Sequence, residues 1–170
     1  LNMFVMYVKN TATTGIQRTS GKLISETYDL LGTTPSCVRT YSNVVWSTGS
    51  ATGTYVVPFG TTATYIPFTA NITTGGVGNL TVGTHHTAAN NTPYPGANVN
   101  VDDTTYTGID NSAYTVDRFW YVTSGSNSGT ADFTFTYDDR STVGDDVASL
   151  SGGVNGSDGT GLRAQQWNGA

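Results

Sequence analysis

Apolar and polar residues alternate along several short runs of this chain, which is the period of half-buried strands. The clearest run is 131–139, where Phe133, Phe135 and Tyr137 face one way and the polar residues between them face the other. No window has the apolar spacing of three and four residues that an amphipathic helix needs. The pattern therefore predicts an all-β fold built of antiparallel strands.

Similar runs of Val, Thr, Tyr and Ile recur along the chain, separated by Gly, Asn, Asp and Pro. The other predicted strands are 1–8, 22–30, 36–48, 53–60, 64–73, 78–86, 117–122 and 162–169. About nine or ten strands at this spacing predict a β-sandwich, either immunoglobulin-like or jelly-roll-like. Run 117–122 is apolar on both faces, so we expect a central strand that forms a hairpin with 131–139. Pro58 and Pro67 predict edges, bulges or strand ends.

The opening segment, residues 1–8, is the most apolar part of a polar chain. One face would carry Leu1, Met3, Val5 and Tyr7, and the other would carry Phe4, Met6 and Val8. A strand that is apolar on both faces needs cover on both. Two arrangements satisfy this: the segment is the first strand of its own sandwich, or it enters a groove of a neighbouring copy by β-strand addition. We therefore divide the chain into an N-terminal strand and polar hinge (1–15) and a sandwich domain (16–170).

Composition narrows the functional classes. Charged residues make up only 11% of the chain and the net charge is −5, with no basic run for nucleic acid. No apolar segment approaches the roughly 20 residues that span a bilayer, so we expect no membrane insertion. Cys37 is the only cysteine, which excludes an internal disulfide and fits a small buried apolar side chain. We expect a mature or excised piece of a secreted precursor, located outside the cell or on its surface.

Motifs for catalysis are missing, so we expect no enzyme. The two histidines, His85 and His86, are adjacent, and neighbouring strand residues point to opposite faces. They are therefore poorly placed to share one metal ion. No nucleophile elbow, phosphate-binding loop or zinc-protease motif occurs in the chain.

Two groups of residues are candidates for ligand binding. Four aspartates fall within one short region and offer hard oxygen ligands for Ca²⁺: Asp138, Asp139, Asp145 and Asp146. Such doublets are also common as solvated turn residues. Trp46 and Trp167 could stack on sugar rings, although core packing is the commoner role of a strand tryptophan.

Several stretches together resemble a known group of proteins. They include GKLISET (21–27), TYVVPFGT (54–61), VDRFWYV (116–122), FTFTYDD (133–139) and LRAQQWNG (162–169). Their succession resembles the β-sandwich modules of large surface proteins in Bacteroidota-type bacteria. The resemblance implies a sandwich fold, export by the type IX route and an adhesive or gliding-related role. It provides no catalytic residues.

Five positions match glycosylation patterns, which would place them on an exposed surface. Asn71, Asn79, Asn90 and Asn155 begin N-glycosylation sequons. Thr104 lies in a sequence similar to the O-glycosylation acceptor of secreted Bacteroidota proteins.

These observations lead to two functional expectations. The first is an extracellular structural or adhesive protein, a self-assembling filament or pilus-like subunit joined by β-strand addition. Its partners would be copies of itself or neighbouring domains of the same precursor. The alternative is a carbohydrate-binding β-sandwich module for surface glycans, with or without Ca²⁺.

Overall fold

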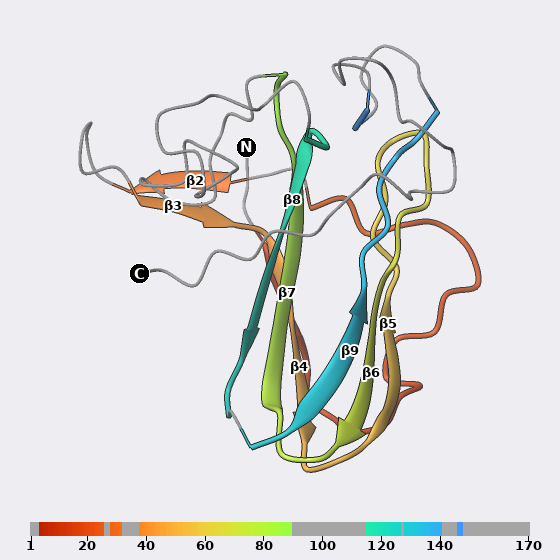
Figure 1. The fold of residues 1–170 in the computed structure, drawn as a ribbon, viewed down its shortest axis with the longest axis vertical. Coiled ribbons are helices and arrows are strands. Elements are labelled where there is room, and N and C mark those ends of the chain that lie inside the picture. Colours follow the sequence, from red (N-terminus) through yellow and green to blue (C-terminus); the bar gives the residue numbers. More distant parts are fainter. Residues whose placement is uncertain are drawn as a thin grey trace. The chain divides into compact units, whose positions relative to one another are not determined.

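A computed structural model describes residues 4–25, 28–31, 38–89, 115–126, 128–140 and 146–147 of the chain. Every regular element in these ranges is a strand (Figure 1). The strands are β1 (Val5–Val8), β2 (Tyr28–Leu31), β3 (Val38–Tyr41), β4 (Asn43–Gly49), β5 (Gly53–Val57), β6 (Phe68–Thr74), β7 (Gly78–His86), β8 (Arg118–Ser124) and β9 (Thr130–Thr134). The predicted all-β class is confirmed. Among these residues there is no helix of the length and hydropathy that a membrane crossing requires.

The strands form two main sheets and one small one. The order is β1-β4-β7-β8 in the four-stranded sheet and β5-β6-β9 in the three-stranded sheet, while β2 and β3 pair separately. The β4–β7, β5–β6 and β6–β9 pairs are antiparallel. Strand β1 instead runs parallel to β4, which departs from the antiparallel pairing predicted from the sequence. A parallel partner requires a long connection, and here residues 9–42 supply it.

The chain divides into two compact units. The second contains Leu30–Arg39, His86–Phe119 and Tyr137–Ala170, and the first contains the remaining residues, with most of both main sheets. We describe each unit by itself.

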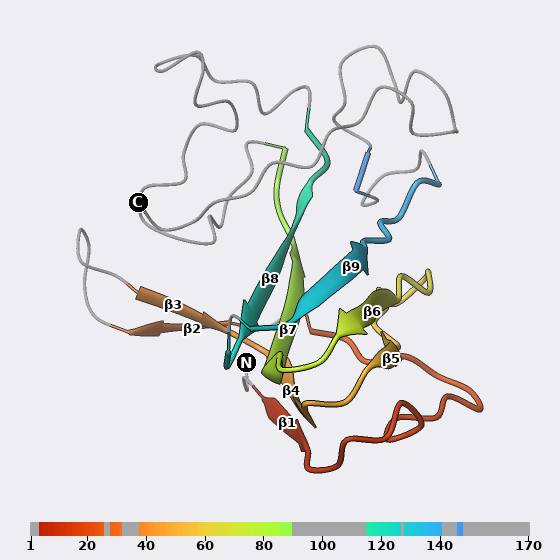
Figure 2. The same ribbon diagram turned by 60° about the horizontal axis from the view of Figure 1, so that its bottom comes forward.

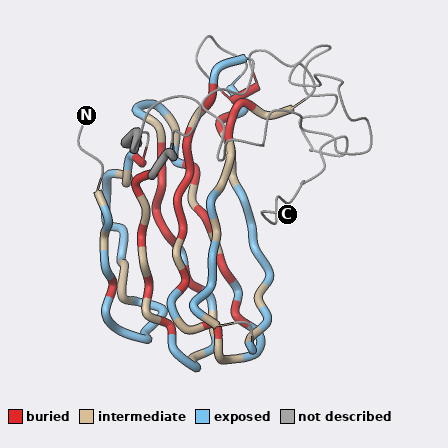
Figure 3. The backbone as a smooth tube through the Cα atoms, turned by 90° about the vertical axis from the view of Figure 1, so that its left-hand side faces the viewer, coloured by how far each residue is buried: buried red, intermediate tan, exposed pale blue. Residues whose placement is uncertain are grey.

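The core of the first unit lies between its two sheets, and it follows from strands with alternating burial (Figure 3). The four-stranded sheet contributes Val8, Val44, Trp46, Leu80 and Val82, and the three-stranded sheet contributes Tyr55, Val57, Phe68, Ala70 and Ile72. The Trp46 and Tyr55 rings meet edge to face across the gap, with their centroids 5.0 Å apart. Antiparallel-rich sheets that share one apolar core are what the alternating sequence runs predict.

The region around β8 and β9 differs from the prediction. These strands belong to different sheets, so the expected hairpin is wrong and the chain passes from one sheet to the other between Ser124 and Thr130. Strand β8 is also the last in its order within the described residues, not central. Pro58 directly follows β5 and Pro67 directly precedes β6, so the predicted strand ends are confirmed.

Residues 9–15, predicted to be a hinge, are anchored to both sheets. The indole nitrogen of Trp46 donates to the carbonyl oxygen of Asn10 at 3.1 Å. The hydroxyl of Tyr55 donates to the carbonyl oxygen of Thr11 at 2.8 Å. Because the two aromatic residues come from opposite sheets, these bonds tie the segment that follows β1 across one end of the core.

Removing the hydroxyl in Tyr55→Phe should lower the free energy of unfolding by about 1 kcal/mol, because the Thr11 carbonyl loses its partner. Tyr65→Phe is the matched control, since the ring of Tyr65 is partly exposed and stacks with Arg18 without needing its hydroxyl. Urea unfolding of both variants measures the difference. Equal stabilities would show that the segment is not held by this bond.

Candidate functional site

Strand β1 lies at the edge of the four-stranded sheet within the described residues (Figure 2). One of its faces is covered and the other is open. Its register places Met6 beside Val44 and Val8 beside Trp46, and Met6 and Val8 pack against the core. Val5 and Tyr7 point to the other face and remain 39% and 63% exposed. Within this chain, one face of β1 is therefore uncovered, and cover of that face by a neighbouring copy stays a prediction.

Local hydrogen bonds explain why β1 begins where it does. The backbone N–H of Phe4 donates to the hydroxyl of Ser42 at 3.1 Å, and the carbonyl of Phe4 accepts from Asn43 N at 3.1 Å. These bonds fix the register with β4, which places the odd-numbered side chains outward. Leu1 and Met3 lie outside the described residues.

A buried network of charged side chains lies in the second unit. Asp146, fully buried, accepts from Arg118 Nε through Oδ2 at 2.7 Å and pairs with His86 Nδ1 through Oδ1 at 2.9 Å. The backbone N–H of Asp138 also donates to Oδ2 of Asp146, at 2.7 Å. Arg140 binds the buried carboxylate of Asp138 with two parallel bonds of 2.7 Å. Buried carboxylates are tolerated when they are satisfied in this way.

The network holds the Asp146 carboxyl in its ionised form. Burial raises the pKa of this carboxyl, but hydrogen bonds from His86 and Arg118, the charge of Arg118 and the Asp138 N–H together lower it below its ordinary 3.8. Backbone bonds complete the junction, because Asp146 N donates to Asp138 O and Asp117 N donates to Asp146 O. Three segments distant in sequence are therefore joined at one carboxylate.

The predicted Ca²⁺ ligands are only partly brought together. Asp138 and Asp146 are neighbours, Asp139 is exposed, and Asp145 lies outside the described residues. Both buried carboxylates are already bound by arginine, which is unfavourable for an added cation. Among the described side chains, no group of three or more His, Cys, Asp or Glu could hold a metal ion. The Ca²⁺ site stays a prediction that this geometry does not support.

The predicted sugar platform is not available at Trp46. This side chain is 1% exposed and packs in the core, so neither ring face can stack on a sugar. Trp167, Cys37, Asn90, Thr104 and Asn155 lie outside the described residues. Among the remaining sequon residues, Asn71 and Asn79 are both exposed.

The two histidines separate as predicted for adjacent strand residues. His85 is buried and meets the ring of Tyr41 edge to face at 5.5 Å. His86 instead contacts Asp146. Sequence reasoning did not anticipate the roles of Arg118 and Arg140. The sequence feature that could have indicated these roles is the pairing of adjacent opposite charges in Asp117-Arg118 and Asp139-Arg140, because the chain has few charged residues.

Comparisons with protein-family models, with curated proteins and with solved structures found no match to this chain.

Asp146→Asn should lower the free energy of unfolding by roughly 3–5 kcal/mol, because buried Arg118 loses its counter-charge. Asp132→Asn is the control, since Asp132 is exposed on β9, and it should change stability by less than about 0.5 kcal/mol. Chemical unfolding measures both variants. Similar small losses in the two would show that the network contributes little.

Stability should also depend on Asp146 at acid pH. Because its pKa is lowered in the folded chain, the folded state binds this proton less readily than the unfolded state does. The contribution is therefore complete above the ordinary pKa of 3.8 and is lost as the pH falls through the lowered folded value. Thermal melting between pH 2 and pH 7, values chosen to bracket that window, should show a shallower acid slope in Asp146→Asn than in the wild type. Identical slopes would contradict this assignment.

Proposed function

We propose that this chain is an extracellular structural or adhesive module that associates with its own kind through β1. In this proposal the described strands belong to a β-sandwich of nine or ten strands, immunoglobulin-like or jelly-roll-like, and the repeating unit forms a filament. The single observation that carries the proposal is the exposure of Val5 and Tyr7 on an edge strand.

An open edge strand with apolar side chains favours association. In the described sheet β1 pairs only with β4, so the backbone groups along its other edge are available to an added strand. Because Val5 and Tyr7 are 39% and 63% exposed, burying the exposed parts of their side chains would contribute only a part of the roughly 1.5–3 kcal/mol that full burial of an apolar side chain gives. The unpaired edge and the exposed side chains therefore favour the same partner, a strand laid beside β1.

The anchored segment 9–15 defines how such an association would occur. Withdrawing β1 from its own sheet would break the bonds from Trp46 and Tyr55 and expose Val8. Addition of a neighbour's strand to the free edge of β1 keeps all of these contacts. We therefore favour edge addition with β1 in place over exchange of β1 between chains.

The carbohydrate-binding alternative has less support. One of its two tryptophans, Trp46, is part of the core, and no described residue replaces it as an exposed tryptophan platform.

Purified chain should form oligomers or filaments, visible by negative-stain electron microscopy and by light scattering after size exclusion. The double variant Val5→Ser, Tyr7→Ser and the deletion of residues 1–8 should both leave monomers. Val56→Ser is the matched control, because Val56 is 36% exposed on β5 and lies on a different strand. A wild-type chain that stays monomeric at high concentration, or a double variant that assembles normally, would refute the proposal.

A further inference from the structure

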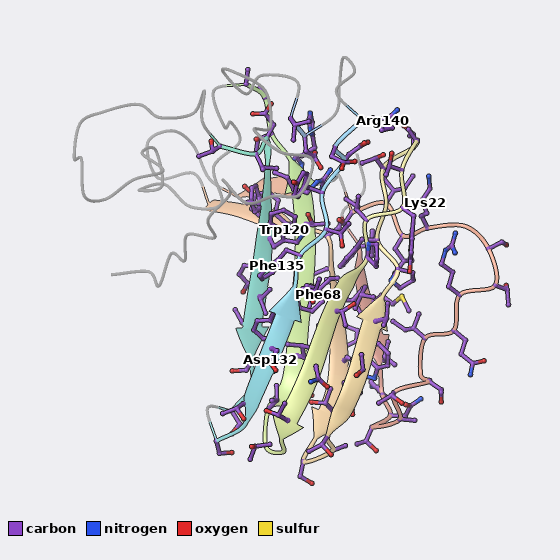
Figure 4. The ribbon with its side chains drawn as sticks, turned by 45° about the vertical axis from the view of Figure 1, so that its right-hand side comes forward. Lys22, Phe68, Trp120, Asp132, Phe135 and Arg140 are labelled. Carbon is purple, nitrogen blue, oxygen red and sulfur yellow. The ribbon has the colours of Figure 1, made fainter. Side chains whose placement is uncertain are left out.

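Four aromatic side chains of β6, β8, β9 and the residues after β9 form one cluster in the first unit. Figure 4 labels three of them: Phe68, Trp120 and Phe135. Phe68 lies in the core, with Phe133 and Phe135 centred 5.5 and 5.6 Å from it, and Trp120 lies 5.3 Å from Phe135. We call these four residues the aromatic cluster. Its inner member is fully buried, but Phe133 and Phe135 are 41% and 37% exposed.

This exposure occurs where both sheets end. Strand β8 is last in the four-stranded order and β9 is last in the three-stranded order, so within the described residues no further strand pairs with the outer edge of β9. The alternating sequence pattern predicts that Phe133 and Phe135 lie on the buried face of their strand. Both side chains do contact Phe68 in the core. They remain partly exposed, and no further strand pairs with β9 in the described sheet.

One hydrogen-bond donor in the aromatic cluster has no acceptor. The indole Nε1 of Trp120 is buried and has no partner. A buried donor without an acceptor is unfavourable, so a rearrangement that provides an acceptor would be favourable. A strand added beside the cluster brings backbone carbonyls, which are acceptors of the required kind.

The chain itself carries a segment that complements this surface. Strand β1 is short, exposes Val5 and Tyr7, and has a free edge, as described above. Charge favours the same pairing: residues 1–25 hold Lys9, Arg18 and Lys22 and no acidic residue. The buried Asp138 and Asp146 are already paired with arginine, but Asp132 on β9 is exposed and carries the opposite charge. Opposite charges of this kind steer association and fix its orientation.

We propose that the free edge of β9, with the aromatic cluster, is the docking site for β1 of a second copy of this chain. The added strand extends the three-stranded sheet, and Val5 and Tyr7 pack beside Phe133 and Phe135. Cross-strand pairs between aromatic and β-branched side chains add to the stability that backbone pairing provides. This inference rests on the proposed function and names the partner surface for the same β1 strand.

The pairing determines the form of the assembly. The two surfaces, β1 and β9, are different parts of the chain. Each copy therefore binds one neighbour through its β1 and a second neighbour through its β9. A contact of this heterologous kind closes into a ring or grows into a filament. The apolar side-chain patch is small compared with a standard interface of about 1,600 Å², so backbone pairing and repetition along the filament must supply the rest.

Cysteine cross-linking tests the pairing directly, in a Cys37→Ser background that leaves no native cysteine. Tyr7→Cys chains mixed with Phe133→Cys chains should give a covalent dimer under mild oxidation or with a short bismaleimide. Val56→Cys mixed with Phe133→Cys is the matched control and should stay monomeric, because Val56 lies on β5. Either single variant alone should also give little dimer. Absence of dimer in the first mixture, or equal dimer in the control, overturns the inference.

A second measurement separates this inference from the proposed function. Phe133→Ser should lower the extent of assembly at least tenfold while leaving the far-ultraviolet dichroism of the chain unchanged. If Val5→Ser, Tyr7→Ser abolishes assembly and a folded Phe133→Ser variant assembles normally, β1 acts through another surface, and only the inference fails. If the wild-type chain does not assemble, the proposed function fails as well. Protection of Phe133→Cys from a maleimide by a polysaccharide, and not by a second copy, would also overturn the inference.

Discussion

The edge-to-face contact between Trp46 and Tyr55 is the interaction on which the first unit depends. Each ring comes from a different sheet, and each donates a hydrogen bond to the segment that follows β1. One pair of side chains therefore aligns the two sheets and fixes the course of the N-terminal segment. Because that segment is fixed, β1 lies beside β4 with Val8 inward and Tyr7 outward.

Charged residues make up only 11% of this chain. Most of the described ion pairs belong to the network around Asp146 and Asp138. Asp146 joins β7, β8 and the residues after β9 through His86, Arg118 and Asp138. An apolar cluster could not fix three segments with the same directionality, since hydrogen bonds to a carboxylate constrain angle as well as distance. We regard the network as a structural junction of the second unit, because both buried carboxylates already have cationic partners.

The functional proposals are based on the residues at the edges of the two sheets. Core positions such as Phe68 and Val44 are fully buried, whereas Val5, Tyr7, Phe133 and Phe135 remain open at strand edges. Large exposed side chains beside an unpaired strand edge favour aggregation and are therefore unfavourable in a protein that remains monomeric. In a chain that assembles, the same side chains become the interface. The proposed assembly would cover the exposed residues of β1 and those in and after β9 with a single type of contact.

The sequence by itself determined the all-β class, most strand positions, the strand ends at Pro58 and Pro67, and the separation of His85 from His86. Each of these depends on local properties: side-chain alternation, the missing N–H of proline, and the pleat of a strand. Only the tertiary structure decided that β1 pairs in parallel with β4, that β8 and β9 belong to different sheets, and that Arg118 meets Asp146. Alternation gives the two faces of a strand but not its neighbour, because the partner is chosen by packing among segments far apart in the chain.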